Sequence, residues 1–234
     1  MFNSLFLKTQ PFDFVAIFSN IEKRWYYYVL LAVVLIALCI FAYKGKQNRN
    51  NLTSTQKLVY IAILSALAFL ANYFTFKASD LFQISFVALV GFLAGYLLGG
   101  VGGFAVSFIG DFICGIVMPF GAYNPIIGIG TGLWGFVPGI IFTYFKGNDY
   151  IKTIISFAIC FVLNSFLVNT FGLSIMYGMS FDSLLILLPG KLLTVVGNMI
   201  CSLIFVGVLP RVLPKDKFFI TTNQKDEQTK VINE

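Results

Sequence analysis

Seven apolar stretches dominate this chain of 234 residues, and most of them have about the length needed to cross a bilayer as a helix. Only two ionisable side chains, Asp111 and Lys191, lie well inside these stretches. An ionisable group in hydrocarbon costs about 3 kcal/mol or more, so it is normally paired, turned inward and functional. The pattern therefore predicts a membrane protein that holds or moves a solute.

The composition leaves no room for a soluble domain. Hydrophobic residues make up 58% of the chain and charged residues 11%, against about 25% charged in ordinary soluble domains. The net charge is +6, but the basic residues stand at the ends of the apolar stretches, as membrane topology requires. We therefore expect a lipid bilayer around the chain and no nucleic-acid partner.

The predicted fold class is all-α integral membrane, with five parts along the chain. They are an interfacial segment at residues 1–24, an extra transmembrane helix at 25–43, a polar linker at 44–56, a six-helix membrane domain at 57–210 and a polar tail at 211–234. The six spans are predicted at Lys57–Phe76, Ser85–Leu98, Val101–Met118, Ile126–Phe145, Thr153–Met176 and Leu184–Leu209.

A cleaved signal peptide is the alternative for residues 25–43. This stretch is too long for one, begins too late, and is followed by Lys44-Gly45-Lys46 instead of a small-residue cleavage site. We therefore expect an uncleaved helix.

Positive charge predicts the orientation. The linker, the loop at Lys146–Lys152 and the C-terminal tail share one side and carry most of the basic residues. The opposite loops after the linker offer Lys77 alone. The linker and the C-terminus are therefore expected on the cytoplasmic side.

Glycines recur at helical spacing in the middle of the chain. The positions are Gly91, Gly95, Gly99 and Gly103, then Gly128 and Gly132, then Gly135 and Gly139. Small residues at this spacing let helix backbones approach one another, so packing within the bundle is the favoured interpretation. A glycine-lined passage for a substrate is the alternative.

Four polar residues in the apolar spans are expected at a similar depth below the outer surface of the membrane. At 1.5 Å per residue, Asp111 lies about 12 Å below the outer surface, and Lys191 lies about 10 Å below it. Asn169 and Thr170, in the fifth span, also lie about 10 Å deep. We expect a binding cavity that uses at least one of these groups. The alternative is that Asp111 and Lys191 pair only with each other or with nearby amides.

The outer loop between the third and fourth spans carries aromatic rings and rigid turns. It contains Phe120, Tyr123 and Asn124 between two prolines, and Trp134 follows a few turns further on. Such flat side chains suit a planar ring in a ligand, although anchoring at the membrane interface explains any one of them as well. The outer loop Phe76–Gln83 is placed to cap a cavity here.

Motifs for catalysis and metal binding are absent from the sequence. There is no histidine, no metalloprotease or hydrolase signature and no phosphate-binding loop. The four cysteines each lie in an apolar stretch without metal-ligand spacing. We therefore predict no catalytic residue, no metal and no cofactor in this chain. A membrane enzyme or lipid-modifying factor using Asp111, and a structural membrane protein without ligand, are the rival hypotheses.

Several stretches resemble the substrate-binding S components of energy-coupling factor (ECF) vitamin transporters, over about residues 57 to 210. Ala62-Ile-Leu-Ser-Ala66 is similar to the AxxxA signature of that family. The run from Gln83-Ile-Ser-Phe86 through the glycines to Asp111 resembles the second and third helices of the folate-type subfamily. Leu167-Val-Asn-Thr170 resembles the fifth helix.

The resemblance implies a six-helix S-component bundle preceded by one extra helix, in the bacterial cell membrane. It also implies that the chain is a substrate-binding subunit of an ECF-type ABC importer. Its partners would be a transmembrane coupling subunit and two ATPases that hydrolyse ATP. Ala62 and Ala66 would dock on the coupling subunit. Gln83 and Phe86 join the residues expected at the substrate.

One departure bears on the substrate. The folate-type pattern has arginine in the motif after the fifth helix, whereas this chain has Pro189-Gly190-Lys191 and then Thr194 in place of the pattern's lysine. A lysine ammonium lacks the planar fork that binds a carboxylate through two hydrogen bonds. The expected substrate is a folate-like vitamin or another ring-containing micronutrient.

Overall fold

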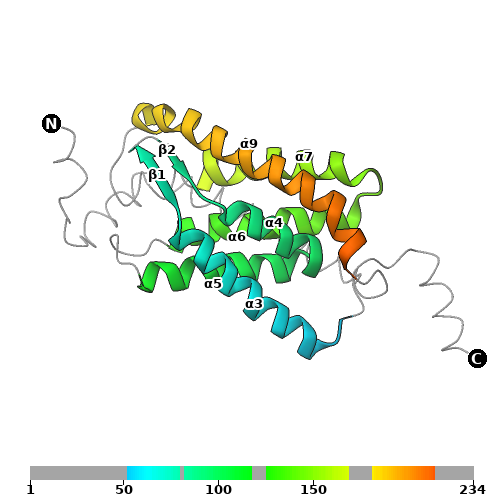
Figure 1. Ribbon diagram of the computed structural model, residues 1–234. Coiled ribbons are helices and arrows are strands. Elements are labelled where there is room, and N and C mark those ends of the chain that lie inside the picture. The colour runs from blue at the N-terminus through cyan, green and yellow to red at the C-terminus, as the bar shows by residue number, and fades with distance from the viewer. Residues whose placement is uncertain (1–51, 80–81, 118–124, 169–180, 214–234) are drawn as a thin grey trace, which may run out of the picture.

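The structure is a computed structural model that describes residues 52–79, 82–117, 125–168 and 181–213. It is a bundle of helices with one short β-hairpin (Figure 1). The elements are α3 (Ser54–Tyr73), β1 (Phe76–Ser79), β2 (Phe82–Ile84), α4 (Val87–Leu98), α5 (Gly100–Val117), α6 (Pro125–Tyr144), α7 (Asp149–Cys160), the π-helical segment η1 (Phe161–Val168) and α9 (Phe181–Val212).

Each of the six predicted spans overlaps a described helix, and the helical membrane domain is confirmed in that respect. Within the described ranges, four helices are long and apolar enough to cross a membrane, namely Ser54–Tyr73, Gly100–Val117, Ile126–Tyr144 and Pro189–Val212. The shorter α4 is also apolar. The interfacial segment, the extra helix and most of the linker and tail lie outside the described residues.

Helix caps place two of the starts earlier than the sequence analysis did. Thr53 and Gln56 form a capping box at the start of α3, in which each side chain accepts from the other's backbone N–H. Asn148 caps α7 by accepting from the backbone N of Tyr150 at 2.9 Å. The predicted loop at Lys146–Lys152 is therefore shorter than expected, because Lys152 already belongs to the first turn of α7.

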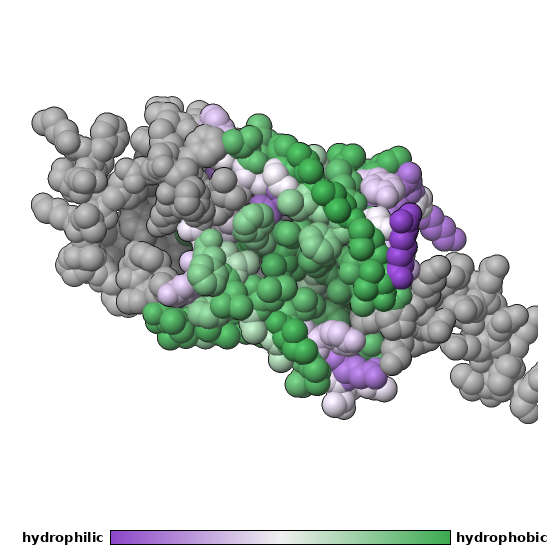
Figure 2. All heavy atoms as spheres, in the orientation of Figure 1, coloured by the Kyte–Doolittle hydropathy of each residue, from purple (hydrophilic) through white to green (hydrophobic). Residues whose placement is uncertain are grey.

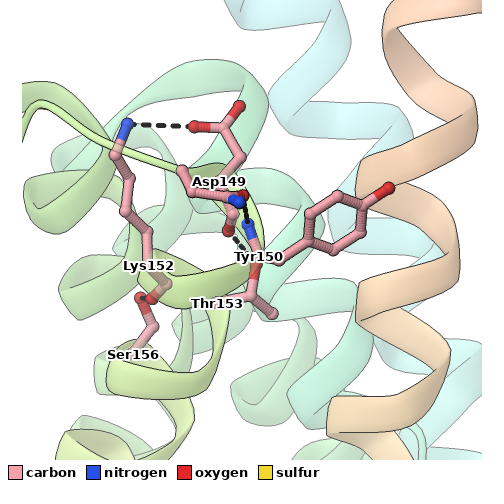
Figure 3. A network of polar contacts seen from close by, with 6 residues as sticks. Asp149, Tyr150, Lys152, Thr153 and Ser156 are labelled. Atoms are coloured by element: carbon pink, nitrogen blue, oxygen red, sulfur yellow. Dashed lines mark hydrogen bonds and ion pairs between the residues drawn. The ribbon is translucent and has the colours of Figure 1, made fainter.

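A polar network surrounds the start of α7 (Figure 3). Lys152 Nζ lies 2.9 Å from the carboxylate of Asp149 and 5.5 Å from the ring centroid of Phe142 on α6. The hydroxyls of Thr153 and Ser156 donate to backbone carbonyls one turn earlier. Figure 3 also shows Tyr150 pointing away from this network toward α9. These contacts satisfy the polar groups of this helix end where it meets its neighbours.

The centre of the bundle is formed by α4, α5 and α6, which approach each other almost backbone to backbone. A Cβ added at Gly95 would collide with the carbonyl of Gly135 and lie 3.0 Å from the backbone N of Gly139. A Cβ at Gly103 would lie 2.6 Å from the Cα of Gly95. The favoured interpretation of the glycine spacing, close helix packing, is confirmed at these positions.

A sharp corner joins α4 to α5 at Gly99. Its φ of +83° lies in the left-handed region that only glycine adopts readily, so the two helices can follow each other with a single residue between them. This corner explains how the short second span runs directly into the third.

The outer helices present apolar side chains to their surroundings. α3 packs on α5 and α4, and α9 packs on α7 and α4. Large apolar side chains are exposed on both helices, with Leu58 at 68% and Ile204 at 63%. Figure 2 shows hydrophobic residues over most of the described surface of one face, with strongly hydrophilic residues toward the right-hand end of the view. This surface suits a lipid bilayer, so the chain is a multi-pass membrane protein.

The hairpin was not predicted, because the segment Phe76–Gln83 was expected as an irregular loop and the fold as all-α. β1 and β2 pair antiparallel with Lys77 opposite Gln83. α3 ends three residues earlier than expected, at Tyr73, and the N–H and hydroxyl of Thr75 both donate to the carbonyl of Asn72. The chain therefore leaves the helix in time to form a strand. The hairpin lies beside α9 (Figure 1), and this end of the bundle is called the hairpin end below.

Candidate substrate-binding site

Lys191 lies at the middle of the inward face of α9. Gly190, Val195, Asn198 and Ser202 are buried on this helix, and a spacing of 100° per residue places Lys191 at the centre of their arc. The side chain itself is partly buried. The lysine therefore faces the bundle and not the lipid.

Asp111 on α5 has an amide partner from a neighbouring helix. Asn72 Nδ2, near the end of α3, donates to Asp111 Oδ1 at 2.9 Å. No ion pair between Asp111 and Lys191 is found among the described residues. The amide of Asn72 is therefore one partner of this carboxylate.

Trp134 lies in the hydrophobic core and not on a surface. It is 6% exposed, and its ring centroid is 5.6 Å from that of Phe157 on α7. Asn164 of η1 binds α6 with both ends of its side-chain amide. The amide oxygen accepts from the indole N–H of Trp134, and the amide nitrogen donates to the carbonyl of Gly130 at 3.2 Å. These contacts tie η1 to α6.

Two further predicted residues lie at the hairpin end. Gln83 is in β2, and Phe86 immediately precedes α4 with 47% of its surface exposed. The remaining predicted substrate residues lie outside the described residues; they are Asn169, Thr170, Asn124, Tyr123 and Phe120. The structure thus brings Lys191, Gln83 and Phe86 to elements that meet at the hairpin end, since α9 contacts β2 and α4.

Three buried or partly buried amides were missed by sequence reasoning: Asn72, Asn164 and Asn198. Asn198 is 2% exposed, and its Nδ2 donates at 2.8 Å to both the carbonyl of Ser85 and that of Thr194. An amide inside an apolar span was the available signal, because a polar group at membrane depth needs a partner within the protein.

Ala62 and Ala66 lie on the exposed side of α3, while Ser65 and Ala68 are buried. The buried Ala68 meets Gly110 of α5, where an added Cβ would lie 2.5 Å from the alanine Cβ. The face with the AxxxA spacing is therefore left uncovered in this chain.

The described residues form an apolar helical bundle of a membrane protein, and α9 turns polar side chains toward its interior. A family model described as "ECF-type riboflavin transporter, S component" matches residues 51–214. The chain belongs to this family of ECF transporter S components. Its role is that of a substrate-binding subunit of an ECF-type vitamin importer, and its family is one of transport components that work with an ECF module.

A solved structure shares the fold. "Crystal structure of FolT bound with folic acid" superposes with a TM-score of 0.55 at 20% sequence identity, covering 67% of this chain and 94% of that chain. No curated protein matches the chain significantly. The resemblance to S components predicted from the sequence is confirmed. The family model is of the riboflavin type, and the similar structure is of a folate-binding protein.

Proposed function

We propose that this chain captures a ring-containing vitamin at the outer face of the bacterial cell membrane and delivers it for ATP-driven uptake. Membership of the S-component family carries this proposal. Riboflavin is the first substrate to test, because the matched family is named for it. A folate-like vitamin is the second, because the FolT structure with the same fold holds folic acid.

The hairpin end is the proposed outer end. The basic residues Lys57, Lys146, Lys152 and Arg211 belong to the opposite end, at the start of α3, around the α6–α7 connection and at the end of α9. An excess of lysine and arginine is typical of cytoplasmic loops, so the linker and C-terminus would be cytoplasmic. Lys191 is near the start of α9 and would therefore face a vitamin arriving from outside.

The proposed architecture is the six-helix S-component bundle preceded by one extra helix. The proposed partners are a transmembrane coupling subunit, which would contact the exposed Ala62 and Ala66, and two ATPase subunits. This chain would be non-catalytic and would carry no cofactor. The family assignment favours transport over the rival hypotheses of a membrane enzyme using Asp111 and of a structural protein.

Mass spectrometry of small molecules that co-purify with the protein tests the proposed function. We expect riboflavin or a folate to be released on denaturation, and the purified protein to bind the same compound in titration. Release of neither, together with no binding of riboflavin or folic acid by protein that remains folded, would contradict the proposal.

The same titration tests the proposed site. Lys191→Met should weaken vitamin binding by about 2–5 kcal/mol, the usual cost of truncating one partner of a buried charged contact. If Lys191 instead only neutralised Asp111, the double change Lys191→Met with Asp111→Asn would leave affinity near normal. A stable double variant with full affinity would rule out Lys191 as a substrate contact.

A further inference from the structure

A polar stripe runs along the inward face of α9. It contains Lys191, Thr194, Asn198 and Ser202. Asn198 follows Lys191 by seven positions, a rotation of two helical turns less about 20°. The two side chains therefore project on nearly the same side of the helix, about 10 Å apart along its axis. Whatever fixes the direction of Asn198 therefore also fixes the direction of Lys191.

Asn198 is fixed by a hydrogen bond to a distant part of the chain. Its Nδ2 donates at 2.8 Å to the carbonyl of Ser85, 113 positions earlier in the sequence. The second hydrogen of the same amide goes to the carbonyl of Thr194, also at 2.8 Å. Ser85 lies between β2 and α4, and its own hydroxyl accepts from the backbone N of Val87 at 3.4 Å. The amide thus links the body of α9 to the junction of the hairpin with α4.

Inside a membrane, a directional hydrogen bond between helices is important for setting their relative rotation. Lipid tails are as apolar as the side chains between helices, so the hydrophobic effect does little to set the rotation of one helix against another. The apolar neighbours of Asn198 on the same face, Val195 and Val206, make non-directional contacts in the core, whereas the hydrogen bond from the amide to Ser85 is directional. A rotation of one residue, 100°, would carry Lys191 off the inward face.

We propose that Asn198 is a positioning residue, which sets the rotation of α9 through its hydrogen bond to Ser85 and so keeps Lys191 turned toward the bound vitamin. This inference rests on the proposed function, because the direction of Lys191 affects binding only if Lys191 contacts the vitamin. Asn198 itself touches no substrate in this proposal.

Ser202 supplies a matched control on the same stripe. It lies one turn beyond Asn198, is 0% exposed, and its hydroxyl has no hydrogen-bond partner among the described residues. A change at Ser202 therefore alters a buried polar group of α9 without removing a link to another element. Ser202→Ala should leave the affinity for riboflavin within about twofold of the original.

A double-mutant cycle between Asn198 and Lys191 tests the proposal. The full chain, its Asn198→Leu and Lys191→Met variants and the double variant are purified and titrated with riboflavin, or with folic acid if that is the vitamin the unaltered chain binds. We expect Asn198→Leu to weaken binding about tenfold when Lys191 is present and less than about twofold when Lys191 is already methionine, because the two changes remove one coupled interaction.

An equal loss in both backgrounds would show that Asn198 supports the fold in general, and would overturn this inference while the role of Lys191 stands. Unchanged affinity in Asn198→Leu would overturn it too. If Lys191→Met alone had no effect, the proposed vitamin contact would fail first, and this inference with it. Should Asn198→Leu not insert, Asn198→Ser, which leaves a smaller polar side chain, enters the same cycle. Failure of both to insert would assign Asn198 to folding alone.

Discussion

Asn72 takes part in the end of α3 with one group and joins α3 to α5 with another. Its carbonyl accepts from Thr75 where the helix ends, and its side chain donates to Asp111 at 2.9 Å. Hydrogen bonds to charged groups contribute about 1.5–3 kcal/mol. Asn72→Leu should therefore lower the free energy of unfolding by about that amount, measured as loss of thermal stability of the purified protein in detergent.

Tyr73 is the control for this prediction. It is the next residue of α3, with 43% of its surface exposed. Its ring centroid lies 6.0 Å from that of Phe69 and 5.1 Å from that of Phe74. Tyr73→Phe keeps these ring contacts on the outer face and should leave stability within about 0.5 kcal/mol. Equal stability of the Asn72 and Tyr73 variants would show that the hydrogen bond from Asn72 to Asp111 does not contribute to the free energy of unfolding.

The charged residues of the candidate site could be predicted from the sequence, whereas the amides could not. Asp111 and Lys191 stand out because a charge is rare in an apolar span. Asn72, Asn164 and Asn198 are neutral, and their importance depends on partners far away in the sequence, such as Ser85 for Asn198. Contacts of that kind follow from the packing of helices and not from the pattern within one helix.

At the scale of the elements, α4 and α6 pack so closely at their glycines that no side chain fits between the two backbones. A Cβ at Gly95 would collide with the backbone of Gly135, which cannot move aside as a flexible side chain can. Gly95→Ala should therefore destabilise the bundle by about 1–3 kcal/mol, the usual cost of overpacking. Thermal unfolding of the purified protein measures the effect.

Gly197 provides the matched comparison, because it lies at an outward-facing position of α9. A Cβ there would meet nothing within 4 Å, and its surface is exposed. Gly197→Ala should be neutral or stabilise α9 by up to about 1 kcal/mol, because alanine favours helix more than glycine does. A Gly95 variant as stable as the Gly197 variant would show that α4 and α6 can separate without cost.

The uncovered face of α3 is the proposed docking surface for the coupling subunit. Ala62 and Ala66 lie one turn apart and are exposed, so two large side chains there would hold a partner helix away. Ala62→Trp combined with Ala66→Trp should abolish vitamin uptake by cells that contain the complete transporter. Vitamin binding by the isolated chain should persist, because neither alanine faces the bundle.

Ala158 on α7 allows the same exchange on a different exposed surface. Ala158→Trp should leave uptake unchanged if α7 faces lipid. Normal uptake in the double variant of α3 would show that the AxxxA face does not dock on the coupling subunit. Loss of uptake with Ala158→Trp would show that the effect of a tryptophan is not specific to the AxxxA face.

The sequence located the helices more reliably than their ends. Hydrophobicity gives the apolar stretches directly, but the starts of α3 and α7 are set by the polar caps Thr53 and Asn148, which precede the apolar runs. The cap residues are visible in the sequence, as threonine three residues before Gln56 and as asparagine before Asp149. The hairpin was harder to foresee, because Phe76–Ser79 and Phe82–Ile84 are too short to show a clear alternation.

At the scale of the whole molecule, the family match begins at residue 51 and ends at residue 214. Residues 1–50 are therefore predicted to be an addition to the vitamin-binding bundle. The capping box at Thr53 and Gln56 satisfies backbone N–H groups at the start of α3 within the matched range.

A chain that begins at Asn51 tests this division of the molecule. It should insert into the membrane and bind riboflavin, or folic acid if that is the substrate, with an affinity within about threefold of the full chain, since a threefold change is only about 0.65 kcal/mol. Titration of both purified chains gives the comparison, and thermal unfolding of each checks that the shortened chain is folded. The Lys191→Met change placed in the shortened chain should weaken binding as it does in the full chain, because the site would be unaltered. A folded, inserted chain that no longer bound the vitamin would show that residues 1–50 belong to the functional core.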